Sequence, residues 1–237
     1  MRFDNGTAIF GSFAKEAGRT GWIIHNAGFL HEGINAVYKS FAVNDIAEAF
    51  KAARLLNFAG FSVSAPYKVN VLGYVDAFGD EIPHIWACNT VVRLGEAYAA
   101  RNTDYLAAHE VLEPLKDKKM VILGYGGYAK AVHYAAQTLG MEVDVLRRKD
   151  LAQAADHRDV VVFNCTPVSD HPVHESCQFI DCVTSTPSGV RLAFLQATHQ
   201  FKIYTGRPYP EPLKKLFLEN NSLDPLIAWY TDRSGGR

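Results

Sequence analysis

Apolar residues recur along the first quarter of the chain with two alternating periods. Residues 7–13, 35–42 and 60–65 follow the period of two that is typical of strands. Residues 22–33 instead read as a helix that ends at Gly33, and residues 46–57 place their apolar side chains on one helical face. The order strand, helix, strand, helix, strand is typical of a βαβ sheet, so an α/β fold is expected here.

The third predicted strand has two different faces. Ser62 and Ser64 alternate with apolar residues, so two hydroxyl groups share one face of the strand. Pro66 cannot donate to a sheet ladder and ends the strand. Lys68 follows at once and brings an ammonium group to the same end of the strand.

The pattern changes in the middle of the chain. Residues 89–93 and 97–101 read as two strands joined by a tight turn, and residues 105–113 read as a helix. The charged run 116–119 is a candidate connector between domains. After it, the buried-type strand 120–123 begins a second, separate βαβ pattern.

A glycine-rich turn joins that strand to an amphipathic helix. The turn reads Gly124-Tyr125-Gly126-Gly127-Tyr128-Ala129. Glycines let a backbone approach a pyrophosphate, and the helix N-terminus supplies free N–H groups. The spacing departs from GxGxxG because Ala129 takes the final small position. We interpret the turn as a dinucleotide phosphate site, with a purely structural turn as the alternative.

The end of the next strand indicates which dinucleotide is bound. An acid there would bind the 2′-hydroxyl of NAD, whereas an arginine accepts the 2′-phosphate of NADP. Arg147, Arg148 and Lys149 follow the strand, and no acid occurs until Asp150. The pattern therefore favours NADP over NAD, although three neighbouring cations also suit a solvated turn.

Composition and charge exclude several classes of protein. Among 237 residues, 48% are apolar and 21% charged, and the net charge is −1. These values exclude extensive disorder and give no basic field for nucleic acid or anionic lipid. The cysteines lack CxxC spacing, and the apolar runs are too short to span a membrane. We expect a cytoplasmic protein with a small-molecule substrate, as a monomer or homodimer.

One stretch combines histidine and cysteine. Its possible zinc ligands are His171, His174, Cys177 and Cys182. Their spacing matches no standard zinc knuckle, so no metal is expected.

A series of short motifs resembles the shikimate dehydrogenase family. In chain order they are His25-Asn26, Val63 to Lys68, Asn89-Thr90, Asn102 to Asp104, Gly124 to Gly127, Asn164 to Pro167, Gly189, Leu195 to Ala197 and Gln200-Phe201. Each string is common alone, but their order and spacing together are specific. Tyr67-Lys68 and the residues around Asp104 are more similar to the shikimate dehydrogenase-like branch than to the housekeeping enzyme.

The resemblance implies an α/β fold with two domains and a cleft between them. A mixed, largely parallel sheet would form the substrate domain, residues 1–104 completed by C-terminal helices 190–237. A compact Rossmann-type domain, residues 105–189, would bind NADP. The implied reaction is reversible hydride transfer between NADP(H) and 3-dehydroshikimate/shikimate or a closely related cyclic hydroxy acid. Its place would be aromatic amino acid biosynthesis, on the way to chorismate.

The resemblance also implies roles for individual residues. Lys68 and Asp104 would be the catalytic pair, with the lysine managing the proton and the aspartate fixing its position. The residues expected to bind substrate are Ser62, Ser64, Asn89, Gln196 and Arg19. The residues expected to bind the cofactor are Gly124, Gly126, Gly127, Tyr128, Ala129, Arg147, Arg148, Thr166, Pro167 and Gly189.

Several positions depart from the family pattern. Arg19 and Gly21 replace two serines that hold the substrate carboxylate in the family. Either Arg19 binds that carboxylate bidentately, or the substrate carries none there. Ser62 and Ser64 replace the usual Asn and Thr, and the cofactor half is short. The alternatives are therefore a dehydrogenase for another ring substrate, such as quinate or an amino analogue, or a non-catalytic metabolite or nucleotide sensor.

Overall fold

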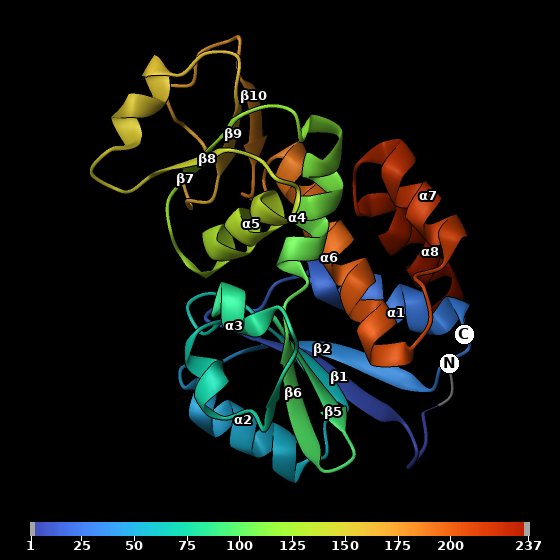
Figure 1. Cartoon of the computed structure of the whole chain (residues 1–237). Coiled ribbons are helices and arrows are strands. Elements are labelled where there is room, and N and C mark those ends of the chain that lie inside the picture. Colours follow the sequence, from blue (N-terminus) through green and yellow to red (C-terminus); the bar gives the residue numbers. More distant parts are fainter. Residues whose placement is uncertain (1–2, 235–237) are drawn as a thin grey trace. The chain divides into compact units, whose positions relative to one another are not determined.

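The computed structural model describes residues 3–234, so residues 1–2 and 235–237 of the predicted substrate domain lie outside it (Figure 1). The chain folds into two compact units. The mixed-sheet unit comprises Met1–Pro83, Cys88–Thr103 and Ala197–Arg237, and the parallel-sheet unit comprises His84–Ala87 and Asp104–Gln196. The chain thus changes unit at 83/84, 87/88, 103/104 and 196/197, where the sequence predicted boundaries at 104/105 and 189/190. The charged run 116–119, predicted as a connector between domains, lies inside the parallel-sheet unit.

The mixed-sheet unit is built on six strands in the order β2-β1-β3-β5-β6-β4. They are β1 (Ala8–Ala14), β2 (Ala36–Ala42), β3 (Gly60–Val63), β4 (Ala77–Phe78), β5 (Thr90–Leu94) and β6 (Ala97–Arg101). The first three are parallel and are connected by α1 (Thr20–His31) and α2 (Ile46–Leu55), so the predicted βαβ order is confirmed. β5 and β6 form the predicted hairpin, which turns at Gly95 with φ of 63°.

Helices cover both faces of this sheet (Figure 1). α2 starts at the cap Asp45, whose carboxylate accepts from the backbone N–H of Ala47 at 2.7 Å. Its buried face packs with the apolar face of β3, including Phe61 and Val63, in one core cluster. On the other face, Phe10 of β1 contacts Phe29 of α1, with ring centroids 5.4 Å apart. The alternation along β3 therefore separates an apolar face from a hydroxyl face, as predicted.

Three helices end the chain. They are α6 (Pro187–Thr205), α7 (Glu211–Asn220) and α8 (Asp224–Ser234). α8 packs on α1, where the rings of Trp22 and Tyr230 meet edge to face at 5.7 Å. The sequence pattern did not predict α8, because Leu226 is its one fully buried apolar side chain among the described residues and no clear helical stripe results.

The parallel-sheet unit has four strands in the order β10-β9-β7-β8, all parallel. They are β7 (Met120–Leu123), β8 (Val143–Leu146), β9 (Val161–Asn164) and β10 (Gln178–Asp181). Its longer helices are α4 (Asp104–Leu112) and α5 (Gly127–Thr138), which pack together. In Rossmann numbering the order is 2-1-4-5, so the sheet lacks the third and sixth strands of a complete Rossmann sheet.

Short segments stand where a complete Rossmann sheet has further strands and helices. The 3₁₀ helix Leu151–Asp156 stands between β8 and β9, and β10 leads to α6 without an intervening helix. The remaining short elements are the helix α3 (Ile82–Ile85) and the 3₁₀ turns Asn70–Gly73 and Glu113–Leu115. The predicted shortening of this half is thus confirmed. None of the helices in residues 3–234 is long and apolar enough to cross a membrane.

Candidate functional site

The glycine turn of the parallel-sheet unit leads directly from β7 into α5. Gly124 has φ of 89°, a conformation that a side chain disfavours, and a Cβ there would lie 3.1 Å from the Thr166 methyl group. Gly126 is the N-cap of α5 and offers no side-chain cap, and no atom lies within 4 Å of a Cβ placed on it. Ala129 is fully buried beneath the turn. The helix start therefore has no side-chain cap, and the space beside Gly126 is open, an arrangement that suits an anion.

This turn lies at the switch point of the sheet. β7 and β9 are neighbours, but the chain continues to β8 on one side and to β10 on the other. In such sheets, ligands bind at the carboxyl ends of the two strands where the direction changes. Gly124 follows β7, and Thr166 and Pro167 follow β9 at that position.

Asn164 shapes the loop after β9. Its Oδ1 accepts from the backbone N–H of Thr166 at 2.9 Å and from its Oγ1 at 2.8 Å. Its Nδ2 donates to the Val168 carbonyl at 2.7 Å and to Asp181 Oδ1 at 3.0 Å. Gly189 lies nearby at the start of α6, where a Cβ would overlap the Val183 carbonyl. These contacts fix the backbone next to the glycine turn, and the contact made by Asp181 could not be predicted from any local pattern.

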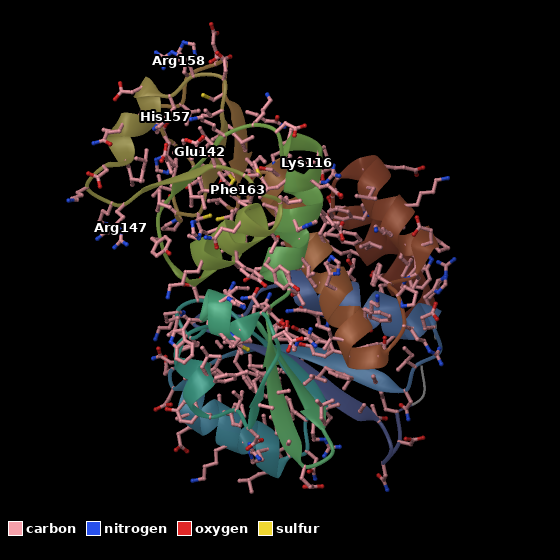
Figure 2. All side chains as sticks on the ribbon, viewed as in Figure 1. Lys116, Glu142, Arg147, His157, Arg158 and Phe163 are labelled. Atoms are coloured by element: carbon pink, nitrogen blue, oxygen red, sulfur yellow. The ribbon has the colours of Figure 1, made fainter. Side chains whose placement is uncertain are left out.

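Aromatic and cationic side chains border the turn. The Arg147 guanidinium, on the segment after β8 (Figure 2), lies 5.0 Å from the centre of the Tyr125 ring. Arg148 is exposed beside it. The ring centroids of Tyr128 and Phe163 lie 6.4 Å apart. Burial, together with the negative charge of Asp104, raises the pKa of Tyr128 well above its usual value. A cation–π contact thus connects one of the two predicted phosphate-binding arginines to the turn.

In the mixed-sheet unit, a chain of hydrogen bonds crosses the hydroxyl face of the sheet. Ser62 Oγ donates to Gln200 Oε1 at 3.0 Å, and the Tyr38 hydroxyl lies 2.7 Å from Ser62 Oγ. Because Ser62 gives its proton to Gln200, Tyr38 must be the donor, as must Tyr204 at 3.3 Å. Burial raises the pKa of Tyr38 to about 12 and raises that of Tyr204 well above its usual value, so both keep their protons.

Gln200 also determines which nitrogen of His25 carries the proton. His25 Nε2 lies 3.3 Å from Gln200 Oε1, and a carbonyl oxygen only accepts, so the imidazole proton is on Nε2. His25 is fully buried, and Nδ1 has no partner among residues 3–234. Burial lowers the pKa of His25 to about 3. The imidazole is neutral at physiological pH, which suits a structural residue rather than an acid or base.

The chain of bonds continues to Asn89. Gln200 Nε2 donates to Thr90 Oγ1 at 3.0 Å, and Thr90 Oγ1 donates to Asn89 Oδ1 at 2.8 Å. Asn89 in turn accepts from the backbone N–H of Thr103 at 2.7 Å and donates to its Oγ1 at 2.9 Å. Thr103 directly precedes Asp104, the first residue of α4, which is 3% exposed. The network therefore extends from Tyr38 on β2 to the residue before the predicted catalytic aspartate.

Lys68 lies in the turn that follows the cis Ala65–Pro66 bond. Its carbonyl accepts from the Cys88 N–H at 2.7 Å, and the neighbouring Tyr67 hydroxyl donates to the Val43 carbonyl at 2.7 Å. The Lys68 side chain is in a half-buried position, whereas Ser64 is exposed. Burial raises the pKa of Cys88 to about 12, so this thiol is not a nucleophile.

The other two predicted substrate residues lie in different surroundings. Arg19 is the N-cap residue of α1 and lines a pocket between the starts of α1 and α8, whose lining includes none of Ser62, Ser64 and Asn89. Gln196 lies at the point where α6 passes from one unit to the other, and its Nε2 donates to the Ala193 carbonyl at 3.0 Å.

The histidine and cysteine stretch contains no metal-binding arrangement in the described part of the chain. His171 Nε2 instead lies 2.9 Å from Thr166 Oγ1, and His174 Nδ1 lies 3.0 Å from Ser176 Oγ.

Comparison with known proteins adds to this geometry. Residues 21–91 match the model of the shikimate dehydrogenase substrate binding domain. A protein named shikimate dehydrogenase (NADP(+)), from Bacillus cereus strain AH187, is 32% identical over 134 residues, which cover 53% of this chain and 48% of that protein. The resemblance to the shikimate dehydrogenase family is confirmed. The chain spans about half the length of the curated relatives that it matches.

Solved structures extend the likeness to the fold. A shikimate 5-dehydrogenase-like protein has a TM-score of 0.76 at 24% identity, covering 99% of this chain and 100% of that one. The 5-ketofructose reductase of Gluconobacter sp. strain CHM43 has the same TM-score at 21% identity, covering 92% of this chain and 99% of that one. At these identities the likeness concerns the fold alone, and it confirms the expected α/β class of the shikimate dehydrogenase family.

Proposed function

We propose that the chain is an NADP-dependent oxidoreductase that interconverts 3-dehydroshikimate and shikimate or a closely related cyclic hydroxy acid. We further propose that it acts in the cytoplasm, as a monomer or homodimer. The observation that carries the proposal is the match of residues 21–91 to a shikimate dehydrogenase substrate binding domain, because this stretch contains Lys68 and the polar face of β3. A curated relative named for NADP and shikimate supports the same reaction.

In this proposal, the mixed-sheet unit handles the substrate. Lys68 donates a proton to the oxygen of the ketone during reduction and accepts it from the alcohol during oxidation. Asp104 orients the ammonium group of Lys68. Ser64, Asn89 and Gln196 bind ring hydroxyls, whereas Ser62 acts through its bonds to Tyr38 and Gln200. Because Asn89 is held by Thr90 and Thr103, its side chain is oriented before substrate arrives.

The parallel-sheet unit holds the nucleotide in this proposal. The turn of Gly124, Gly126 and Gly127 fits a pyrophosphate, because the helix start is uncapped and its approach is open. NADP supplies or accepts the hydride when bound. The groups proposed to contact it beyond the pyrophosphate are Arg147 and Arg148 at the 2′-phosphate, and Tyr128, Ala129, Thr166, Pro167 and Gly189 around the turn and nicotinamide.

A second candidate is the reduction of a different ring or sugar ketone. Arg19 and Gly21 stand where the family places its two carboxylate-binding serines. Ser62, at the position of a substrate-binding asparagine, has its hydroxyl bonded within the protein. A protein named 5-ketofructose reductase has a similar fold, so the fold accommodates other ketones.

A substrate panel tests both candidates. Purified protein is assayed for NADPH formation or consumption with shikimate, quinate, 3-dehydroshikimate and 5-ketofructose. The proposal predicts turnover with the shikimate pair, and a clear preference for another member would favour the second candidate. NADPH binding without turnover of any member would contradict both and favour a sensor.

A further inference from the structure

The pocket at Arg19 differs in chemistry from the rest of the mixed-sheet unit. It has a volume of about 160 Å³ and is lined by three residues from the start of α1 and three from the start of α8. These are Arg19, Trp22, Ile23, Leu223, Asp224 and Ile227. Both helices belong to the same unit, so the pocket is complete within it.

Two opposite charges in this pocket are unpaired. Within residues 3–234, neither the Arg19 guanidinium nor the Asp224 carboxylate has a hydrogen-bond or ion-pair partner. The contact of Asp224 to its neighbour Ser222 is made by its backbone N–H, which donates to Ser222 Oγ at 3.2 Å. A guanidinium fork pairs best with a carboxylate, and a carboxylate accepts from an ammonium group. The pocket therefore offers complementary groups to a molecule that carries both charges.

The other lining residues and the volume of the pocket restrict the chemistry and size of that molecule. Ile23, Leu223 and Ile227 are aliphatic, and Trp22 is held edge to face against Tyr230. Pockets for drug-sized ligands have volumes of about 300–1,000 Å³, so this pocket suits a more compact ligand. We propose that it binds a free α-amino acid with a branched aliphatic side chain. The carboxylate would lie on Arg19, the ammonium on Asp224 and the side chain against the isoleucines.

This inference goes beyond the proposed dehydrogenase and does not rest on it. The pocket lining includes neither Lys68 nor the glycine turn. Binding can therefore be measured on the full chain without nucleotide, and its outcome is separate from that of the turnover assay.

Calorimetric titration with three matched ligands tests the proposal. L-leucine carries both charges, 4-methylpentanoate lacks the ammonium group, and 3-methylbutylamine lacks the carboxylate. We expect saturable binding of L-leucine and binding at least about tenfold weaker for each analogue, because each loses one charge-assisted contact. Absence of saturable leucine binding, or equal affinity for all three ligands, would overturn the proposal.

Two variants with matched controls complete the test. R19Q and D224N should each weaken leucine binding about tenfold. R93Q, on β5, and D232N, also on α8 but facing solvent, should leave it unchanged. Leucine affinity that is the same in R19Q and D224N as in the wild type would contradict the assignment. The ligand comparison decides the question without any variant if a substitution impairs folding.

Discussion

The polar groups of the two units differ in how they are hydrogen-bonded. In the mixed-sheet unit, Ser62, Gln200 and Asn89 bond to one another and to tyrosine and threonine hydroxyls, so the polar face is ordered without a ligand. In the parallel-sheet unit, the start of α5 is left without a side-chain cap at Gly126. One unit is therefore pre-organised by internal bonds, whereas the helix start of the other has no side-chain cap, as the proposed phosphate site requires.

The largest effect is expected at Asp104, the first residue of α4. Asp104→Asn should lower turnover about a hundredfold, because a neutral amide cannot orient an ammonium group as a carboxylate does. The measurement is kcat with NADP and the best substrate of the panel. Asp117→Asn, in the exposed turn before β7, is the control. Unchanged kcat in D104N would remove Asp104 from the catalytic pair.

Removal of Gln200 from the internal network is expected to lower the stability of the fold substantially. Gln200→Met keeps the size of the side chain but leaves Thr90 Oγ1, Ser62 and His25 Nε2 without their shared partner. The free energy of unfolding should fall by about 2 kcal/mol, measured by urea denaturation. Gln137→Met, on the exposed side of α5, should cost far less. Equal losses in both variants would show that the network adds nothing.

The buried imidazole predicts a dependence of stability on pH. His25 has a pKa of about 3 in the folded chain and about 6.5 when unfolded, so only the unfolded chain takes up a proton between these values. The contribution of His25 is complete above about pH 6.5 and is lost as the pH falls toward 3, with a slope approaching about 1.4 kcal/mol per pH unit.

Comparison of wild type with His25→Gln isolates this term. Urea denaturation at about pH 7.5 and about pH 5 should show a smaller loss of stability in H25Q than in the wild type. His31→Gln, at the exposed end of α1, serves as the control. The same pH dependence in H25Q and wild type would mean that His25 takes up its proton in the folded chain.

The smallest effects are expected for alanine at Gly124 and Gly140 of the parallel-sheet unit. Comparison of the two variants distinguishes backbone strain from ligand binding. Gly124 and Gly140 have φ of 89° and 74°, so alanine at either position should cost about 1 kcal/mol of stability. Only at Gly124 would the new methyl group lie against Thr166. NADPH affinity should therefore fall about fivefold in G124A, or ~1 kcal/mol, and stay unchanged in G140A. Equal loss of affinity in both variants would contradict a role for the turn.

Much of the fold could be predicted from the sequence because its signals are local. The two strand–helix alternations, the turn at Gly95 and the glycine turn before α5 follow from apolar period and backbone freedom. α8 could not be predicted, because its contacts with α1 bury too narrow a face to leave a helical pattern.

The candidate site was less predictable because its bonds join distant residues. Gln200 contacts Ser62 and Thr90, which are 138 and 110 positions away. Strand alternation indicated that Ser62 faces away from the apolar core, but nothing local showed that Tyr38 and Tyr204 would bond to its hydroxyl. Gln200 lies one turn after Gln196 on α6 and belongs to one of the family motifs, so its position did offer a signal.

The measurement that tests the central claim most directly compares wild type with Lys68→Ala. Absorbance at the reduced-nicotinamide band is followed with NADP and shikimate, and NADPH binding is titrated in both proteins. We expect turnover in the wild type, a fall of about a hundredfold or more in K68A, and equal NADPH affinity, because Lys68 belongs to the mixed-sheet unit and the glycine turn to the other. Undiminished turnover in K68A would contradict the account.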